Sequence, residues 1–385
     1  LTGQVLCANF VRDLATLDKC AGQVVELGHA QFVRALALLE QGFEVRLYEQ
    51  ASQLAEVGAG LQISPNGVKV LQHWGLAEEL TPLVCAAAGK EIRLWSTGQR
   101  WKLFDLGEDC LQRFGAPYWM VHRGDLHQVL ARAVQSRAPG CITLGARITA
   151  AHSDGSGVSL HTEDGRTFQA DALIAADGVH SRLRQQCLGE DKPQFMDLLA
   201  WRGLVPMQRL PAHLRQPVGT NWVGPGAHVI TYPVHGGALM NVVGIVERGD
   251  WRGESWTEPG SHEELLRDFG RWHEDVRTLM SHIDQPFKWA LLGREPRRGW
   301  AHGPVCLVGD AAHVVHPLAG QGMNLGFADI DALLTALNEQ GKESDCGDDR
   351  MLARYARLRK EEVLLMQLTT DGLHRLFSSE LAPVR

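Results

Sequence analysis

The stretch from residue 305 to residue 333, VCLVGDAAHVVHPLAGQGMNLGFADIDAL, constrains the fold of this chain most strongly. It begins with an apolar run of strand length at 305–308, and Gly309 and Asp310 follow directly. A turn around Pro317 then leads to the glycine-rich sequence GQGMN at 320–324, which opens an apolar-periodic helix. The pattern predicts a buried strand that delivers one carboxylate beside the N-terminus of a helix.

This arrangement suits a ligand that carries ribityl or ribose hydroxyls and an electron-rich ring. A carboxylate accepts hydrogen bonds from hydroxyls, and the free N–H groups at a helix N-terminus stabilise negative charge. A single Asp that caps a strand–turn–helix explains Gly309 and Asp310 about as well when the pair is taken alone. The length of the whole pattern favours a ligand site.

Length and composition set the broad class of protein. A chain of 385 residues with 44% hydrophobic and 22% charged residues is typical of a soluble protein with two or three domains. Its net charge of −7 argues against a nucleic-acid partner, because phosphate binding needs a cationic face. Eight cysteines without a C-x-x-C pair favour reduced thiols over a disulfide framework or zinc site. With no apolar run of bilayer length and no basic signal-peptide start, we expect a cytoplasmic protein without an integral membrane segment.

The first half of the chain has the order of a dinucleotide-binding fold. A helix predicted at 32–41 ends at Gly42, and a strand at 44–48 ends in Glu49. An acid at the end of the second strand binds ribose hydroxyls in such folds, although a solvated loop residue is the simpler explanation of Glu49 alone. The later elements are a helix from Arg123 to 134, meander strands at 143–149, 158–162 and 167–170, and a buried strand at 172–176 that ends at Asp177 and Gly178.

The residue composition and the expected secondary structure change between residues 186 and 297. This part has strands rich in Trp, Val and Tyr at 200–206, 228–234 and 240–246, and a helical segment at 262–280. It predicts a separate antiparallel sheet. A closing helix at 351–372 carries charge on one face and Leu and Met on the other. That apolar stripe indicates either core packing or the surface of a homodimer.

The segment 305–333 resembles the Gly-Asp FAD motif of the single-component flavoprotein aromatic hydroxylases, which have the p-hydroxybenzoate hydroxylase fold. The resemblance covers most of the chain from about residue 33. Glu49 matches the family's ribose-binding acid, Arg123 with Leu126 matches its R-x-x-L element, and Asp177 begins its Asp-Gly motif. The resemblance implies FAD contacts at Gly28, Glu49, Gln50, Arg123, Asp177, Gly178, Gly309, Asp310, Gly322, Met323 and Asn324.

The fold class that follows is α/β (α+β), a Rossmann-like FAD-binding domain with an inserted antiparallel-sheet substrate domain and a C-terminal helix. We expect the FAD-binding domain in two parts, at 1–185 and 298–335. The substrate-binding sheet then occupies 186–297, and a helical segment occupies 336–385.

Two parts of the chain indicate different branches of the family. Residues 56–66, 221–225, 254–260 and 288–291 are similar to segments of salicylate hydroxylases and 3-hydroxybenzoate 6-hydroxylases. The segments 320–324 and 371–377 look more like the ubiquinone-biosynthesis hydroxylases. The favoured substrate is therefore a small phenolic acid of the 3-hydroxybenzoate or salicylate type, and a polyprenylated phenol is the alternative.

The phosphate loop departs from the family pattern. The expected G-x-G-x-x-G falls on Glu26, Gly28 and Gln31, so the middle glycine alone remains. A Glu at the first position adds negative charge near a pyrophosphate. This departure keeps open a flavin-free homologue that has a binding role only.

The resemblance implies an FAD-dependent monooxygenase that uses NADH or NADPH as a transient reductant and O₂ as a co-substrate. In this class the reduced flavin forms a C4a-hydroperoxide, which transfers OH to an electron-rich carbon of a small aromatic substrate. A deprotonated phenol activates that carbon, so a general base near the phenol raises the rate.

The catalytic prediction rests on one strand. His228 and Tyr232 are four residues apart, and strand alternation puts them on the same face. They match a His and a Tyr that line the substrate pocket in 3-hydroxybenzoate 6-hydroxylase and 6-hydroxynicotinate hydroxylase relatives. His228, with an ordinary pKa near 6.5, is predicted to take the phenol proton, and Tyr232 to orient the substrate. The resemblance places Gln321 beside the phenol oxygen, and Pro317 and Trp201 in the substrate pocket.

Other polar residues carry weaker signals. His235, His313 and His316 lack the spacing of zinc ligands, so no metal is expected. Arg46 and Arg202 are explained equally by a substrate carboxylate or by surface ion pairs.

Overall fold

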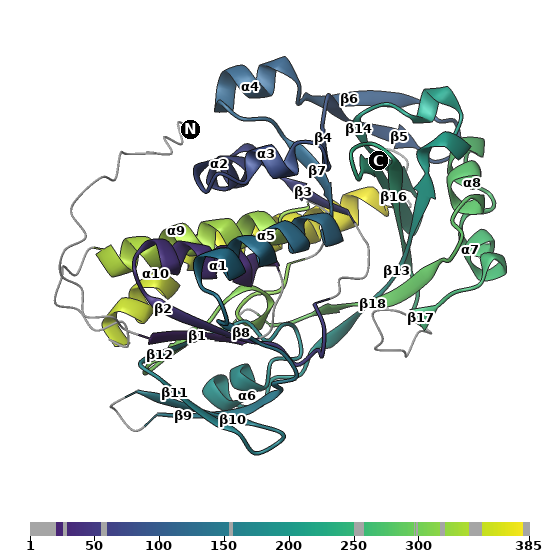
Figure 1. Ribbon diagram of the computed structural model, residues 1–385. Helices are drawn as coiled ribbons and strands as arrows, with labels where there is room; N and C mark the ends of the chain where they lie inside the picture. The colour runs from purple at the N-terminus through teal and green to yellow at the C-terminus, as the bar shows by residue number, and fades with distance from the viewer. Residues whose placement is uncertain are drawn as a thin grey trace.

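The computed structural model describes residues 21–25, 29–54, 60–153, 157–249, 258–295, 297, 299–315, 320–338 and 349–379. Figure 1 shows a parallel sheet with long helices stacked over one side and a small meander on the other. A second, larger sheet stands beside this unit, and two short helices, α7 and α8, cover its outer side (Figure 1). The expected fold class, with both helices and a large inserted sheet, is confirmed.

The parallel sheet has six strands in the order β19-β20-β12-β1-β2-β8, and its short edge strand β19 runs antiparallel to β20. These strands are β1 (Ala21–Val25), β2 (Glu44–Tyr48), β8 (Ile142–Thr143), β12 (Ala172–Ala175), β19 (Ala301–His302) and β20 (Val305–Leu307). Leu173 pairs with Val305 in parallel register, so the strand after residue 304 returns to the sheet as predicted. Apolar side chains fill β12 and β20 because protein covers both faces of the sheet.

Long helices lie over this sheet (Figure 1). They are α1 (His29–Glu40), α5 (Arg123–Arg137), α9 (Gly322–Asn338) and α10 (Asp349–Phe377). Helix α1 packs against both α5 and α9, and buries Phe32, Val33 and Leu36 completely. Gly42, with a φ of +85°, ends the helix in the left-handed conformation that glycine favours. None of the helices in the described part of the chain is both long enough and apolar enough to cross a membrane.

Smaller elements complete the first unit. The strands β3 (Gly60–Ile63), β4 (Val84–Ala86) and β7 (Trp119–His122) form a three-stranded sheet. The strands β9 (Ile148–Ser153), β10 (Val158–Thr162) and β11 (Thr167–Ala170) form a meander. The second and third strands lie where they were predicted, but the strand predicted at 143–149 is divided between β8 of the parallel sheet and the start of β9. Helices α2 (Pro65–His73), α3 (Ala77–Leu80), α4 (Glu108–Phe114) and α6 (Arg182–Leu188) connect these parts.

The second sheet has eight strands in the order β17-β18-β13-β16-β15-β14-β5-β6. Its strands are β5 (Gly89–Leu94), β6 (Arg100–Asp105), β13 (Gln194–Pro206), β14 (Val218–Gly224), β15 (Ala227–Val234), β16 (Leu239–Glu247), β17 (Glu258–Pro259) and β18 (Phe287–Gly293). All neighbours are antiparallel except β14 and β5. Two strands from before residue 186 therefore extend the predicted insert, and the exact domain limits stay a prediction.

One face of this sheet is covered by α7 (His262–Phe269) and α8 (Glu274–Ser281). The helical segment predicted at 262–280 is present, and Gly270 ends α7 before α8 begins. The Ser261 side chain accepts from the backbone N–H of Glu264, and the Glu264 side chain accepts from that of Ser261. This capping box fixes the start of α7 over the sheet.

Trp201 belongs to the core beneath these helices. It is 1% exposed, and its indole N–H donates to the Asp268 carboxylate at 2.7 Å. Because side chains alternate along β13, Trp201 faces α7 whereas Arg202 faces the opposite side of the sheet. The prediction that Trp201 lines the substrate pocket is therefore wrong.

Replacing this core residue should cost stability without changing the opposite face. We expect Trp201→Ala to lower the free energy of unfolding by about 3–5 kcal/mol, the usual cost of removing a buried aromatic side chain. Chemical denaturation followed by circular dichroism measures this loss. Trp201→Phe is the matched control and should retain most of the stability, since it keeps a ring in the core. A Trp201→Ala protein as stable as the parent would contradict this packing.

Candidate active site

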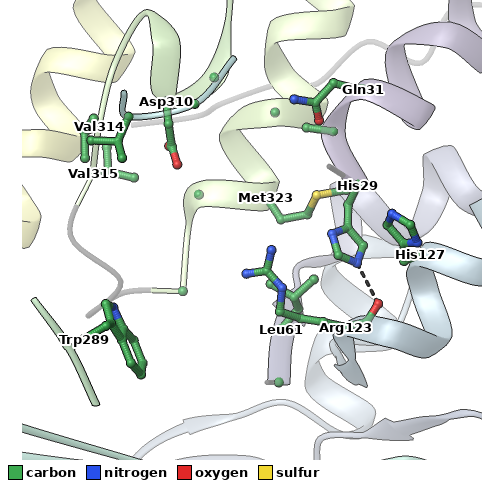
Figure 2. A pocket seen from close by; sticks show the side chains of 18 of the residues that line it. His29, Gln31, Leu61, Arg123, His127, Trp289, Asp310, Val314, Val315 and Met323 are labelled. Carbon is green, nitrogen blue, oxygen red and sulfur yellow. Dashed lines mark hydrogen bonds between the residues drawn. The ribbon is translucent and has the colours of Figure 1, made fainter. Parts of the chain in front are cut away.

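A cavity of about 590 Å³ lies between the two sheets. One wall comes from α1, the loop after β2, the starts of α5 and α9, and the turn after β20. The other wall comes from β13, β15, β16 and β18 of the large sheet. Figure 2 shows Asp310, Arg123 and Trp289 projecting into this space from different directions. A large cavity with a few convergent polar groups is the default location of a ligand site.

Glu49 stands at the end of β2 and lines the cavity. It is 7% exposed, and its carboxylate accepts a hydrogen bond from the backbone N–H of Ala51 at 2.7 Å. Gly178, just beyond β12, lines the same wall. These two residues follow parallel strands, and the carboxyl ends of such strands are where dinucleotide folds bind ligands.

Asp310 lies in a single 3-10 turn, η3 (Gly309–Ala311), that follows β20. Gly309 has a φ of +56°, which lets the chain turn sharply and direct the Asp310 side chain into the cavity (Figure 2). Burial raises the pKa of this carboxyl group, while the positive charges of His313, Arg123 and Arg34 act in the opposite direction. The predicted strand that delivers a carboxylate is thus present.

The starts of α1 and α5 are joined at the cavity wall. Nε2 of His29 lies 2.7 Å from the carbonyl oxygen of Arg123 and donates to it, shown as the dashed line in Figure 2. His29 also packs edge-to-face on His127, with ring centroids 5.4 Å apart. Sequence reasoning found Arg123 but missed both histidines, because no local pattern distinguishes them from ordinary helix residues.

Helix α9 begins at the cavity with Gly322 and Met323, as the glycine-rich sequence predicted. Asn324, which was predicted to contact FAD, binds other parts of the chain. Its side-chain oxygen accepts from the backbone N–H of Ser64 at 3.0 Å, and its amide donates to the carbonyl of Gln62 at 3.2 Å. Asn324 thus ties α9 to the end of β3 and is not among the described residues that line the cavity.

Several predicted contacts remain predictions. Asp177 accepts from Ser181 and from the backbone N–H of Leu183, so it holds the start of α6 and is absent from the described lining. The described lining also leaves out Gln50 and Gln321. Gly28 and Pro317 lie outside the described residues.

On the opposite wall, Arg202 and Trp289 form a stacked pair. The Arg202 guanidinium lies 5.1 Å from the centroid of the Trp289 ring, and Arg202 is only 6% exposed. Arg202 is therefore a buried residue of the cavity wall and does not lie on the protein surface. The apolar side chains Ile230, Val243, Ile245 and Leu291 line the sheet beside this pair.

Tyr232 lines the cavity on β15, as predicted. Burial, followed by the neighbouring Tyr118, raises the pKa of its hydroxyl above the usual value, so it keeps its proton at neutral pH. Gly60 packs directly against the Tyr232 ring, where a Cβ would collide with it. The backbone N–H of Gly60 also donates to Asn241 at 2.9 Å, which fixes this close approach.

His228 is on the expected face of β15 but does not reach the cavity. The end of α10 covers it: its Nδ1 lies 3.4 Å from the Ser378 hydroxyl, and its ring lies 6.0 Å from that of Phe377. It is 0% exposed, and burial, together with His374, lowers its pKa to about 3. The prediction that His228 is the catalytic base is therefore wrong, because a helix from the far end of the chain separates it from the ligand space.

The buried, neutral His228 should make stability depend on pH. Between its folded pKa of about 3 and its ordinary value of 6.5, the unfolded chain binds a proton that the folded chain does not. Stability therefore falls as the pH falls through this window, by up to about 1.4 kcal/mol per pH unit from this group. Going from pH 6.5 to pH 5, the parent should lose about 1.6 kcal/mol more than His228→Gln, because the unfolded histidine is already half protonated at pH 6.5.

Denaturant unfolding at a series of pH values measures this difference. His73→Gln, which changes an exposed histidine, is the matched control and should follow the parent. Parallel pH curves for His228→Gln and the parent would refute the assignment of a neutral buried histidine.

The match to known proteins agrees with this geometry. The family model described as "FAD binding domain" matches residues 25–366, most of the chain. The chain therefore belongs to this family. It is a flavin-dependent aromatic monooxygenase with FAD as its cofactor, and NADH or NADPH is typical for such enzymes.

Three relatives show where in the family it falls. It is 35% identical over 340 residues to 3-amino-4-hydroxybenzoate 2-monooxygenase PtmB3 of Streptomyces platensis, covering 88% of this chain and 84% of the relative. It is 34% identical to 6-hydroxynicotinate 3-monooxygenase of Pseudomonas fluorescens, covering 83% and 82%. It is 31% identical to 3-hydroxybenzoate 6-hydroxylase of Polaromonas naphthalenivorans, covering 84% and 82%.

Solved structures support the same fold. A salicylate hydroxylase substrate complex superposes with a TM-score of 0.78 at 26% identity, covering 94% of this chain and 90% of that one. HpxO of Klebsiella pneumoniae, complexed with FAD and uric acid, superposes with a TM-score of 0.81 at 23% identity, covering 97% and 92%. The expectation of an FAD-dependent aromatic hydroxylase is thus confirmed, and the flavin-free alternative loses its support.

The residues on the first wall fit FAD. Two carboxylates, Glu49 and Asp310, face the cavity and suit ribose and ribityl hydroxyls, while Arg123 supplies a cation. The start of α9 presents backbone N–H groups to the same space. This donor and acceptor set matches a ligand that carries hydroxyls, phosphates and a polar ring.

Removing the Asp310 carboxylate should weaken FAD binding. We expect Asp310→Ala to raise the Kd for FAD by about 10–100-fold, since a hydrogen bond to a charged group contributes about 1.5–3 kcal/mol. Flavin fluorescence titration of the apoprotein measures the Kd. Asp164→Ala, in an exposed turn of the meander, is the matched control and should bind FAD normally. Unchanged affinity in Asp310→Ala would place FAD elsewhere.

Proposed function

We propose that this enzyme hydroxylates a small phenolic acid of the 3-hydroxybenzoate or salicylate type, using O₂ and either NADH or NADPH. The observation that carries the proposal is the buried Arg202 stacked on Trp289 at the cavity wall, with the protonated Tyr232 on the same face of the sheet. A guanidinium and a phenolic hydroxyl beside apolar residues suit a ligand with a carboxylate, an aromatic ring and a ring oxygen.

Arg202 is assigned to the carboxylate. A guanidinium is planar and always charged, and it binds a carboxylate through two parallel hydrogen bonds. Stacking on Trp289 holds the guanidinium plane in place and adds a cation–π interaction. Because Arg202 is almost fully buried, water screens its charge poorly, which strengthens the attraction for an anionic substrate.

The aromatic ring is assigned to the apolar strip between Arg202 and Tyr232. In the sheet, Arg202 pairs with Val243, which in turn pairs with Ile230 on β15. Two strand spacings separate the backbones of β13 and β15 by roughly 10 Å. The side chains of Arg202 and Tyr232 extend from these strands toward one space, as the two substituents of a benzoic acid require.

Tyr232 is assigned to the ring oxygen of the substrate. Its raised pKa keeps the proton on the tyrosine hydroxyl, so it donates a hydrogen bond to that oxygen. Such a bond stabilises the deprotonated form of the phenol and thereby enriches the ring carbon in electrons. Gln321, at the start of α9, is proposed as a second partner of the same oxygen.

The first wall is assigned to the cofactor. Bound FAD supplies the activation of O₂ and the oxygen atom transfer. Glu49, Arg123 and Asp310 hold it, and Asp177 and Gly178 serve it from the end of β12. The apolar residues of the large sheet keep water away from the reacting ring.

The relatives support this substrate class. The substrates in their names, 3-amino-4-hydroxybenzoate, 6-hydroxynicotinate and 3-hydroxybenzoate, all combine an aromatic ring, a carboxylate and a hydroxyl.

We also propose a reducing, cytoplasmic setting, since Cys85, Cys110, Cys141, Cys187 and Cys306 are free thiols. The exposed Leu365 and Leu368 on α10 are the proposed surface of a homodimer.

Arg202 gives the sharpest test of the substrate class. We expect Arg202→Gln to raise the KM for the aromatic acid by about 10–100-fold, the cost of one charge-assisted pair. The FAD content should stay unchanged, because Arg202 lies on the wall opposite Asp310. The measurement is NADH or NADPH oxidation and product formation with a panel of hydroxybenzoates, neutral phenols and a polyprenylated phenol.

The control variant is Arg209→Gln, which removes an exposed arginine that pairs with Asp284 in the same part of the chain. It should leave KM unchanged. A parent enzyme that hydroxylates the neutral polyprenylated phenol faster than any acid would contradict the proposal. So would an Arg202→Gln variant with the parent's KM for acids.

A further inference from the structure

We propose that Arg34 binds the pyrophosphate of FAD and replaces the glycine phosphate loop that this chain lacks. The proposal rests on the FAD-dependent function and concerns how the cofactor is held. Two glycine positions of the family loop are Glu26 and Gln31 here, so the loop itself has lost part of its usual fit to a diphosphate.

The Gln31 side chain forms a hydrogen bond that joins two elements of the fold. Its side-chain amide donates to the carbonyl oxygen of Ala176 at 2.9 Å, joining the start of α1 to the end of β12. Gln31 also lines the cavity (Figure 2). The position where the family has a glycine for close packing is therefore occupied by a side chain that bridges the two elements instead.

Arg34 is one helical turn further along α1, on the same face as Gln31. It is 1% exposed and lines the cavity. One nitrogen, Nη2, donates to Asp329 at 3.0 Å. The other two, Nε and Nη1, have no hydrogen-bond partner among the described residues. A buried guanidinium with unmet donors is costly unless a ligand accepts from it.

The location of these donors identifies the ligand group. A Cβ placed on Gly309 would lie 3.7 Å from Nη2 and 3.9 Å from Nη1, so the guanidinium borders the turn that carries Asp310. Asp310 is assigned to the ribityl chain, which is covalently joined to the pyrophosphate. A planar cation with free N–H groups at this point suits phosphate oxygens.

A purely structural ion pair accounts for less of the geometry. Asp329 already accepts from Arg359 at 2.9 Å and lies 3.2 Å from His313. Its carboxylate is therefore satisfied without Arg34. A purely structural role also does not explain why Arg34 lines the cavity or why two of its nitrogens have no hydrogen-bond partner among the described residues.

The test uses three ligands that differ in phosphate content. Apoprotein is titrated with FAD, ADP and riboflavin, by fluorescence or by competition with FAD, for the parent, Arg34→Leu and Arg34→Lys. We expect Arg34→Leu to weaken FAD and ADP binding by about 10–100-fold and to leave riboflavin binding unchanged. Arg34→Lys should recover part of the loss. Arg46→Leu, which removes an exposed arginine from the neighbouring strand β2, is the control and should match the parent.

Two results would overturn the proposal. One is parent-like affinity of Arg34→Leu for FAD and ADP, and the other is an equal loss for riboflavin, which indicates a structural role. If Arg34→Leu fails to fold, Arg34→Lys decides: parent-like FAD and ADP affinities with a parent-like salt dependence would refute the contact. If the parent protein binds no FAD, the assignment of FAD itself is contradicted. If the parent binds FAD but hydroxylates no aromatic acid, only the proposed substrate is contradicted.

Discussion

A buried carboxylate, Asp329 on α9, joins the parts of the chain that shape the cofactor wall. It binds Arg34 of α1, His313 just after η3 and Arg359 of α10, at 3.0, 3.2 and 2.9 Å. Burial alone would raise its pKa, but His313 and the two arginines hold that pKa well below the usual range. Removing the Asp329 carboxylate would leave its buried cationic partners uncompensated, and the loss of such a buried partner typically costs about 3–5 kcal/mol. The turn that carries Asp310 keeps its position for this reason.

The two walls of the cavity have different chemistry, and the reaction needs both. The wall built on the parallel sheet is charged and rich in donors and acceptors, which suits a cofactor with phosphates and hydroxyls. The wall built on the large sheet is apolar around one guanidinium and one phenol, Arg202 and Tyr232. Short contacts, such as the bond from Gly60 to Asn241, connect the walls and fix the distance between them. Orientation across this gap is what the protein contributes to chemistry that the cofactor performs.

Local patterns predicted the first wall well and the second only in part. Glu49 and Asp310 follow apolar strands directly, so their place at the carboxyl edge of a parallel sheet follows from the sequence. Alternation put His228 on the correct face but gave no sign that α10, about 150 residues later, covers it. Trp201 and Arg202 are adjacent in β13, so their side chains face opposite sides of the sheet. The sequence alone did not indicate which of the two faces the cavity. Arg34 escaped notice because its partner, Asp329, is 295 residues away in the chain.

The central claim is that one cavity holds FAD against the parallel-sheet wall and a phenolic acid against Arg202 and Tyr232. A crystal structure of the FAD-loaded enzyme with 3-hydroxybenzoate tests it most directly. The account predicts the substrate carboxylate on the Arg202 guanidinium and the ring over Ile230 and Val243. The ring oxygen should lie within hydrogen-bond distance of the Tyr232 hydroxyl. An acid bound outside this wall, or an FAD whose ribityl chain does not contact Asp310, would contradict the account.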